Sequence, residues 1–486
     1  MGQYRGYASF SVERRGIDYV PRSERPLTVR GLAGLWAGAS FNLEYVVYGA
    51  LVTSLGLDLA QALAVIVVGN LAWVVTGLAS LQGPAAGTTA FGVGRAVFGP
   101  RPNRALAALN WLTQVGFETL GLALVVLAGL ALAREAGADP GIPAKCALVA
   151  VAAGAQLCLP WFGHATLTAV LKVLGWLFAG SFVCLAVLAA PRVHLASAVH
   201  GASWQALTIA AVVVLSGGAM SWTENANDYS RYLPAGVRGK SVVGAVVLGG
   251  GVPVLLAEVL GAVVASGLHD PSSVSVVTGL PGAFPPWFTV PYLAVAICQL
   301  LAINALDLYS SGVSLQAAGA PLRRSQCGLV DTLACAALTA WAILSSSFTT
   351  VLGDFVQLIM VWLAPWAGVY LVDAALRRGH YDLGSLFSAS AGIYRRRNGW
   401  SPAAVWAQLL GMGAALASTD SGPFVGPLSR LSGGADLSIY LGFGVAAGIY
   451  FLLGRSTVHD DVAKSDPGEP PPTVPGSGSV AKLPTT

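Results

Sequence analysis

The sequence is poor in charged residues. Of its 486 residues only 10% are Asp, Glu, Lys or Arg, whereas 55% are hydrophobic. Because soluble proteins carry about 25% charged residues, this composition excludes a soluble fold. The apolar runs are about 20 residues long and lack the alternation of barrel strands, which predicts membrane-spanning helices in contact with a lipid bilayer. The formal net charge of +4 comes from basic loops and does not indicate a nucleic-acid partner.

Residue types that carry catalysis or bind metals are also few. The six cysteines lie in or beside apolar runs without metal-ligand spacing, and the six histidines are scattered mostly over predicted loops. The sequence has no Ser-His-Asp set, no cofactor fingerprint and no phosphate-binding loop of the P-loop type. These absences argue against an integral-membrane enzyme and against direct use of ATP, and they predict no cofactor and no obligate protein partner.

The apolar runs define twelve candidate spans. They cover residues 31–55, 57–81, 104–133, 143–163, 165–190, 205–232, 241–266, 287–318, 328–347, 350–373, 402–420 and 433–454. Arginine and lysine gather in the loops after spans 2, 6, 8 and 10, whereas the loops on the opposite side carry isolated cations at most. Since basic loops stay in the cytoplasm, this bias predicts a multi-pass protein of the cytoplasmic (plasma) membrane with both termini inside.

The chain divides into a membrane domain with two flanking segments. Residues 1–30 form a basic cytoplasmic arm, residues 31–455 the transporter domain, and residues 456–486 a tail that its Pro, Gly, Ser and Thr content predicts to be disordered. Within the membrane domain we expect a first repeat at about 31–190, a second at about 205–373, and two extra helices at about 402–454.

Two spans are interrupted by polar residues. Span 6 is apolar up to Leu215 and then reads Ser-Gly-Gly-Ala-Met-Ser-Trp-Thr-Glu-Asn-Ala-Asn-Asp over residues 216–228. Span 1 is interrupted in the same way by Gly-Ala-Ser-Phe-Asn-Leu-Glu at residues 38–44. Polar groups at membrane depth must line a cavity or bind something. Because the two spans lie five apart, the pattern predicts an inverted repeat of five-helix halves with a binding site at the midplane. A channel, the other alternative among membrane proteins, would not need this arrangement.

Motifs on these spans resemble those of the nucleobase:cation symporter-1 family, in its purine/cytosine permease branch. The similar segments are Glu-Arg-Arg-Gly-Ile-Asp-Tyr-Val-Pro at 13–21, Gly-Pro-Ala-Ala-Gly at 83–87, Phe-Gly-Pro-Arg at 98–101, Thr-Gln-Val-Gly-Phe at 113–117, the Trp-to-Asp-Tyr stretch at 222–232, and Asn-Ala-Leu-Asp-Leu-Tyr-Ser at 304–310. The resemblance implies an all-α LeuT-type fold of five plus five helices with two more at the C-terminal end. It also implies a secondary symporter that takes up a nucleobase with Na⁺ or H⁺.

The resemblance places a planar ring between spans 3 and 6. Phe117 stands where the family has its stacking aromatic, and Trp222 offers a second face because Ala219 stands where some relatives have an aromatic residue. Gln114 can both donate and accept hydrogen bonds to the ring edge. The complete set of expected substrate contacts is Ser40, Asn42, Gln114, Phe117, Glu118, Gly121, Gly218, Ala219, Ser221, Trp222 and Asn304.

Two acidic residues stand near the predicted site. Glu44 lies in the broken part of span 1, and Asp307 stands in span 8 where the family pattern has asparagine. A buried carboxyl must be paired, protonated or bound to a cation. Either residue is therefore a candidate carrier of the coupling proton, and either could complete a Na⁺ site to which Ser310 and Ser311 supply hydroxyls.

Four further residues are candidates for gates. Glu224, Asp228 and Arg231 follow one another at the inner end of span 6, and Trp362 stands in span 10, which the family uses at the outer mouth. An ordinary interfacial salt bridge is the alternative for the first three. The sequence leaves open which ring is carried, whether cytosine, a purine, uracil, hydantoin, allantoin or a vitamin, and which ion drives transport.

Overall fold

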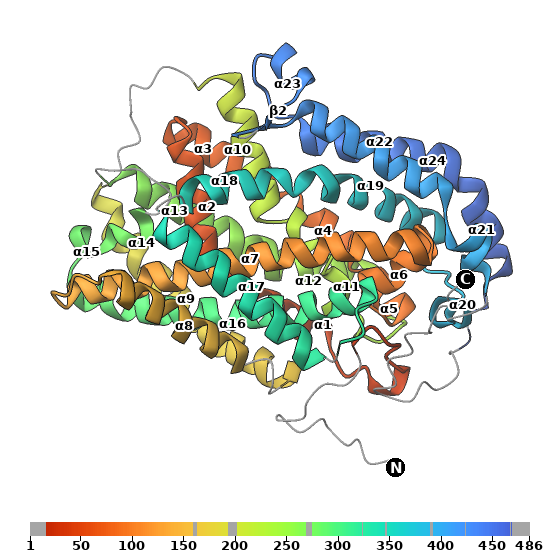
Figure 1. The fold of residues 1–486 in the computed structure, drawn as a ribbon, viewed down its shortest axis with the longest axis horizontal. Helices are drawn as coiled ribbons and strands as arrows, with labels where there is room; N and C mark the ends of the chain where they lie inside the picture. The colour runs from red at the N-terminus through yellow and green to blue at the C-terminus, as the bar shows by residue number, and fades with distance from the viewer. Residues whose placement is uncertain are drawn as a thin grey trace.

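The computed structural model is an elongated helical bundle whose long helices run along its longest axis (Figure 1). The structure describes residues 16–158, 163–192, 202–268, 275–322, 324–345, 348–388, 392–422, 424–466 and 468. The first three residues of the 13–21 motif and the tail from residue 469 lie outside this part. In Figure 1 helices α5, α6, α20 and α21 gather at one end of the bundle, which we call the termini end, and α14 and α15 at the other, the far end.

The described chain contains the twelve predicted spans. Eight helices are long and apolar enough to cross a membrane, three apolar helices are shorter, and two short helices form one broken span. In order, the spans are α1 (Val29–Ser40) with α2 (Leu43–Ser54); α3 (Leu59–Asn70) with α4 (Trp73–Ala79) and α5 (Gln82–Ala86); α7 (Pro100–Glu135); α8 (Ile142–Cys158); α9 (Gly163–Ala189); α10 (Trp204–Gly217) with η4 (Met220–Trp222) and α11 (Ala226–Ser230); α12 (Gly239–Val246) with the π-helix η5 (Val247–Gly251) and α13 (Val252–Ser266); α16 (Pro286–Ala318); α17 (Arg324–Leu344); α18 (Phe348–Leu358) with α19 (Met360–Arg377); α22 (Pro402–Ser418); and α24 (Ser438–Lys464).

Short elements connect the spans. They are η1 (Arg22–Glu24), α6 (Ala90–Val97), η3 (Ala190–Arg192), α14 (Ser275–Thr278), α15 (Leu280–Ala283), α20 (Leu383–Phe387), η6 (Ile393–Arg395), α21 (Arg396–Gly399) and α23 (Pro427–Leu431). A two-stranded antiparallel hairpin of β1 (Asp420–Ser421) and β2 (Phe424–Val425) lies between the last two spans. The described end of the chain is helical to Lys464, so the expectation of disorder from residue 456 was wrong for residues 456–464.

Both predicted interruptions are confirmed. Span 1 breaks between Ser40 and Leu43, where the Asn42 side chain accepts a hydrogen bond from the backbone N–H of Glu44 (2.8 Å) and donates one to the carbonyl of Ala39 (2.8 Å). Span 6 breaks at Gly218, whose φ of −105° and ψ of −107° leave the helical region. At the break of span 1 a polar side chain therefore forms hydrogen bonds with the freed backbone groups. At the break of span 6 the non-helical glycine exposes backbone groups.

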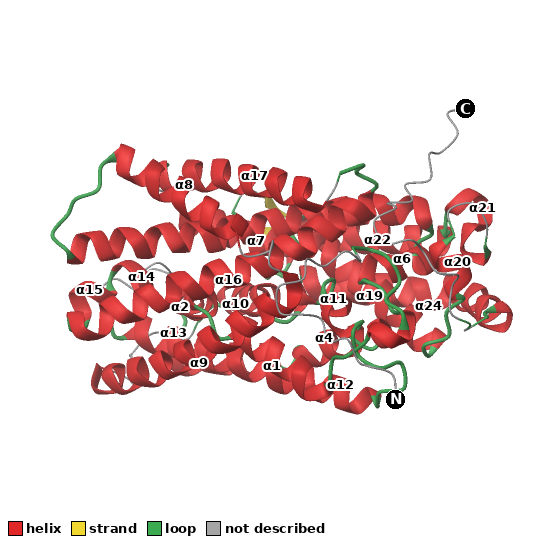
Figure 2. Cartoon of the chain, turned by 90° about the horizontal axis from the view of Figure 1, so that it is seen from below, coloured by secondary structure: helices red, strands yellow, loops and turns green. Residues whose placement is uncertain are grey.

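The arrangement is the LeuT-type inverted repeat. Span 8 (α16) packs along span 3 (α7), α13 of span 7 packs against α2 of span 1, and span 9 (α17) packs against span 4 (α8). Spans 1–5 and 6–10 thus form two interlocked halves, with the broken spans in equivalent positions (Figure 2 gives a second view). The two additional spans, α22 and α24, pack against each other and against α19.

A buried ionic cluster fixes span 10 to span 12. The Nε of Arg377 in α19 donates to Asp373 Oδ2 (2.7 Å), and its Nη2 donates to Asp461 Oδ2 in α24 (2.9 Å). Tyr450 donates its hydroxyl hydrogen to Asp373 Oδ1 (2.6 Å), and Arg396 forms a further ion pair with Asp461. The side chains of Arg377 and Asp373 are completely buried, so each depends on its partners for compensation of its charge.

Spans 1 and 7 approach each other so closely that their point of contact has no room for a side chain. A Cβ added to Gly261 would lie 1.9 Å from the carbonyl oxygen of Val46, whereas one added to Gly34 would meet no atom within 4 Å. We therefore expect Gly261→Ala to cost about 1–3 kcal/mol or more through overpacking. Gly34→Ala, a matched control in another helix, is expected to leave stability unchanged or raised. The thermal midpoint of the detergent-solubilised protein measures both, and equal midpoints for the two variants would contradict the predicted contact.

Candidate functional site

A small cavity lies between the two broken spans. It is lined by Glu44 and Tyr45 of span 1, Gln114 and Phe117 of span 3, Gly217, Ser221, Trp222 and Asn225 of span 6, and Asp307 of span 8. The volume of this cavity is about 20 Å³, which is room for a water molecule but not for an aromatic ring. The cavity is therefore closed around its polar groups in this conformation.

Two aromatic side chains line the cavity. Trp222 donates its indole N–H to the hydroxyl of Tyr45 (2.7 Å) and meets Trp36 edge-on at a ring-centroid distance of 5.4 Å. Phe117 meets Phe355 of α18 edge-on at 5.1 Å. Each ring is held by its neighbours from one side, so the cavity combines two fixed aromatic groups of a kind that planar ligands stack on.

Amide groups complete the polar wall. Gln114 donates to Glu224 Oε1 across spans 3 and 6, at a long 3.5 Å. Glu224 Oε2 and Asn225 Oδ1 are buried without a hydrogen-bond partner. Because buried polar atoms are normally paired, these two acceptors beside the cavity are available to a ligand.

The cavity also holds two carboxyl groups. Glu44 Oε1 accepts a hydrogen bond from the hydroxyl of Tyr48 (2.7 Å), and Asp307 interacts electrostatically with Glu44. In the described part of the chain neither carboxyl forms a salt bridge with a cation. Both carboxyls line the same small buried cavity, where two negative charges would repel each other, so the arrangement favours a proton on one of them.

Three predicted substrate residues lie outside the cavity, in a polar network between spans 3, 4 and 8. Asn304 donates to the backbone carbonyl of Glu118 (3.0 Å) and to Gln156 Oε1 (2.9 Å), and Gln156 donates to Glu118 Oε2 (3.4 Å). Gly121 makes room for this network, since a Cβ there would lie 2.0 Å from Asn304 Oδ1. The α-helical spacing that puts Glu118 one turn from Gln114 does not bring its carboxyl to the cavity wall.

Four other predicted substrate residues lie at the two helix breaks. Ser40 ends α1, and Asn42 caps α2. Gly218 lies at the break of span 6, and the carbonyl of the adjoining Ala219 accepts the hydroxyl hydrogen of Thr76 (2.6 Å). These four residues do not line the cavity, whereas the predicted site residues Gln114, Phe117, Ser221, Trp222, Glu44 and Asp307 do.

The groups expected at a cation site already have protein partners. Ser311 donates to Asp331 Oδ2 of span 9 (2.6 Å), and the hydroxyl of Ser310 lies 3.4 Å from that of Tyr229. The carbonyls of residues 37–40, at the break of span 1, accept hydrogen bonds from Phe41 N, the Gln299 side chain, the Asn42 side chain and Asn42 N, respectively. The carbonyl oxygens at this break, which could otherwise bind a cation, therefore accept hydrogen bonds from the protein itself.

The predicted gate residues occupy two levels. Trp362 of span 10 donates its indole N–H to Thr113 of span 3 (3.1 Å), next to the Phe117–Phe355 contact. Arg231 lies toward the termini end and donates to the hydroxyl of Tyr309 (2.6 Å) and to the carbonyl of Gly16 (2.7 Å). Asp228, in the same turn of α11, is also buried. Glu224 is nearer the cavity, because it accepts from Gln114.

Tyr45 and Asn225 line the cavity but were not predicted as site residues. Tyr45 follows Glu44 directly and receives the Trp222 hydrogen bond, and Asn225 lies inside the polar stretch of span 6. The signal for both was their place at a helix break, where backbone geometry turns neighbouring side chains inward.

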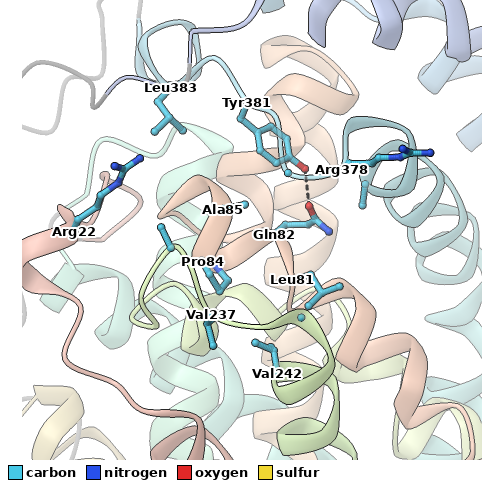
Figure 3. Close-up of a pocket in the computed structure, with 14 residues that line it drawn as sticks. Arg22, Leu81, Gln82, Pro84, Ala85, Val237, Val242, Arg378, Tyr381 and Leu383 are labelled. Carbon is cyan, nitrogen blue, oxygen red and sulfur yellow. Dashed lines mark hydrogen bonds between the residues drawn. The ribbon is translucent and has the colours of Figure 1, made fainter.

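A wider pocket opens at the termini end. Its volume is about 500 Å³, and its walls come from the ends of α5, α12 and α19 (Figure 3). Gln82 and Tyr381 face each other across it, joined by a 2.9 Å hydrogen bond, and Arg22 and Arg378 lie on opposite rims. None of the residues that line it is acidic. The pocket lies away from both helix breaks and lacks a pair of aromatic faces, so it does not match the predicted midplane site.

Comparison with known protein families gives a match over most of the chain. Residues 19–445 match the family model described as "Permease for cytosine/purines, uracil, thiamine, allantoin". The chain is 26% identical over 453 residues to a putative purine-cytosine permease, YxlA, of Bacillus subtilis, covering 91% of this chain and 96% of the relative. It is 23% identical over 468 residues to the purine-cytosine permease fcyB of Emericella nidulans, covering 92% and 89%.

Solved structures share the fold. A closed conformation of Mhp1, a nucleobase-cation-symport-1 family transporter with bromovinylhydantoin bound, matches with a TM-score of 0.72 and 16% identity, covering 93% of this chain and 97% of Mhp1. The inward-facing conformation of Mhp1 matches with a TM-score of 0.67 and 16% identity, covering 92% and 93%. At this identity the likeness establishes the arrangement of helices.

Proposed function

Because this chain belongs to the family of permeases for cytosine/purines, uracil, thiamine and allantoin, we propose that it is a symporter that imports a cytosine- or purine-type nucleobase with a proton. It is a multi-pass membrane transporter and not an enzyme. The observation that carries the substrate proposal is the presence of two aromatic rings, Phe117 and Trp222, in one cavity with carboxyl and amide groups. Such a cavity suits a flat ring with a hydrogen-bonding edge.

The chemistry of the edge favours a base with amino groups. Glu44 and Asp307 lie on the cavity wall and Glu224 beside it, so most of the polar atoms are acceptors. Carboxylates accept hydrogen bonds from an exocyclic amino group such as that of cytosine, and Gln114 can serve a neighbouring carbonyl or ring nitrogen. Uracil lacks the amino group, so we expect cytosine or an aminopurine to bind better than uracil.

Binding requires the cavity to widen. A space of about 20 Å³ cannot hold the ring, so substrate entry must separate spans that are now in contact. Phe355 and Trp362 of span 10 close the cavity against span 3, and the Arg231–Tyr309 contact closes it toward the termini end. We propose that the first group opens to the outside and the second to the cytoplasm, with the termini end inside the cell in the plasma membrane. The alternation of basic loops supports this orientation.

A proton fits the site better than Na⁺ as the coupling ion. The like-charged pair Glu44 and Asp307 favours retention of a proton, and the Ser310 and Ser311 hydroxyls already contact protein groups. The hydrogen bond from Tyr48 stabilises the charged form of Glu44. We therefore assign the transported proton to Asp307, with Glu44 as the charged partner that accepts from the base.

An uptake experiment tests the substrate proposal. Cells that express the chain are given labelled cytosine with unlabelled adenine, hypoxanthine, uracil, allantoin or thiamine as competitors. We expect uptake above the vector control and competition by at least one base that bears an amino group. No uptake and no competition in membrane-inserted protein would overturn the nucleobase assignment, and competition by allantoin or thiamine alone would redirect it.

The stacking role of Phe117 gives a further prediction. Replacement by leucine removes the ring face while keeping an apolar side chain, so base binding is expected to lose about 1–3 kcal/mol, roughly 5- to 150-fold in affinity. Phe117→Tyr keeps the ring and serves as the matched control, with affinity close to that of the parent. Binding of labelled cytosine to purified protein measures both, and equal affinities of the leucine and tyrosine variants would exclude stacking at this position.

A further inference from the structure

Buried acidic residues continue beyond the cavity, between spans 3, 8 and 9. Glu118 and Asp331 are completely buried, and both interact with groups on α16. Their carboxyls are not used by the substrate site described above. They need an explanation, because a buried carboxyl is costly at membrane depth unless it is paired or protonated.

The hydrogen bonds of Asp331 orient both of its oxygens. Trp111 of span 3 donates its indole N–H to Oδ1 (2.5 Å), and Ser311 of span 8 donates its hydroxyl hydrogen to Oδ2 (2.6 Å). Ser311 also lies 3.2 Å from the carbonyl of Leu308, a longer and uncharged alternative. These two hydrogen bonds hold both oxygens of Asp331 in place, with Oδ2 directed at the Ser311 hydroxyl.

Glu118 has the opposite environment. Its Oε2 accepts only long bonds, from Gln156 (3.4 Å) and the Cys335 thiol (3.4 Å), while its Oε1 is buried without a partner. Asn304 Oδ1, in the same network, is also buried without a partner. Both unpaired atoms of this network are hydrogen-bond acceptors. A proton on Glu118 supplies the donor that the network lacks.

Glu118 lies beside the cavity, because it directly follows the lining residue Phe117. Glu118 interacts electrostatically with Asp307 on the cavity side and with Asp331 on the other, and Ser311 lies close to it. Several titratable groups interact with this chain of residues. They are Glu44, Tyr45 and Tyr48 from span 1, Glu224 and Tyr229 from span 6, and Cys327 and Cys335 from span 9. In the described residues none of them is a cation. Asp331 lies about two turns into α17, counted from the termini end.

We propose that Glu118, Ser311 and Asp331 form a proton relay that carries the coupling proton from Asp307 toward the termini end, apart from the path of the base. This inference rests on the proposed function. The protonated Glu118 releases its proton to the Ser311 oxygen, and the carboxylate that is left then takes the proton of Asp307. Ser311 gives its hydroxyl hydrogen to Asp331 Oδ2 in the same step, so no charge remains on the serine. Asp331 then releases the proton to water on the cytoplasmic side.

Transport in proteoliposomes separates the relay from a structural network. Purified protein is reconstituted with labelled cytosine and a pH-sensitive dye in the lumen. Exchange of internal for external cytosine needs no net proton release, whereas accumulation does. We expect Glu118→Gln, Ser311→Ala and Asp331→Asn to keep exchange and to lose both accumulation and cytosine-driven proton entry. Ser311→Thr retains the hydroxyl and is expected to restore both.

Glu258→Gln is the matched control, because Glu258 is also a buried carboxyl on a span but bonds to Asn70 of span 2, outside the proposed relay. It is expected to accumulate cytosine like the parent protein. Accumulation at the parent level by Asp331→Asn and Glu118→Gln would overturn the relay. Loss of both exchange and accumulation in these variants would also overturn it, because that result marks a structural role. Absence of cytosine exchange in the parent protein would instead refute the proposed function.

Infrared difference spectra during a pH change give a readout that needs no substrate. The relay predicts a carbonyl band of a protonated buried carboxylic acid. This band is expected to disappear in Glu118→Gln. In Glu258→Gln it is expected to persist, at the same or at a shifted frequency. An unchanged band in Glu118→Gln would contradict the protonated state assigned to Glu118, whatever molecule the protein transports.

Discussion

Asp307→Asn is expected to abolish concentrative uptake while leaving exchange of the base intact. Asparagine has the shape of a protonated aspartate but cannot release a proton. The variant therefore resembles the proton-loaded carrier permanently, and its cavity keeps a side chain of nearly the same size at this position. Accumulation should fall to the equilibrium level, and the dependence of uptake on external pH should disappear.

The measurement compares accumulation and exchange of labelled cytosine in the same vesicles over a range of pH. Asp354→Asn is the matched control, since Asp354 accepts a hydrogen bond from Gly422 N in a loop and lies outside the cavity. It should behave like the parent protein. Glu44→Gln is expected to weaken binding of the base but to keep proton coupling. Accumulation by Asp307→Asn with the pH dependence of the parent would refute the assignment of the proton to this residue.

Arg377→Met is expected to destabilise the protein by about 3–5 kcal/mol, because it leaves uncompensated charges in a buried cluster. The guanidinium is the shared partner of Asp373 and Asp461, and all three side chains lie at the junction of span 10 with span 12. Span 10 carries Phe355 and Trp362, which close the cavity. Loss of this cluster should therefore also reduce transport by the protein that still folds.

Arg378→Met provides the control for Arg377→Met, because Arg378 is the next residue in the chain and is exposed to solvent. The same change in charge and side chain should alter the midpoint of thermal unfolding very little. Both variants are measured in detergent by loss of monodisperse protein with temperature. Similar midpoints for the two would show that burial of the Arg377 cluster contributes little to stability.

Most of the fold could be predicted from the sequence. Membrane spans depend on the length of apolar runs and on the distribution of arginine, and both are local properties of the chain. The breaks at residues 41–42 and 218 were also visible, because polar and small residues interrupt otherwise apolar helices there. The helical extension of the last span to Lys464 was missed, because its final turns are polar.

The candidate site could be predicted only in part. Gln114, Phe117 and Trp222 were found from motifs, but helical spacing could not tell which neighbours face the cavity. Glu118 and Asn304 share faces with lining residues and yet turn toward Gln156 of span 4. Asp331 is a lone charge in the sequence of span 9, and only the packing of that span against spans 3 and 8 brings it to Ser311 and Trp111.

The most direct test of proton-coupled nucleobase import is accumulation of labelled cytosine by proteoliposomes under an imposed pH gradient in sodium-free buffer. Import with a proton predicts accumulation above equilibrium when the outside is acidic, its collapse on addition of a protonophore, and no stimulation by sodium. Accumulation that follows a sodium gradient and ignores the pH gradient, or no cytosine accumulation under either gradient, would contradict the proposal.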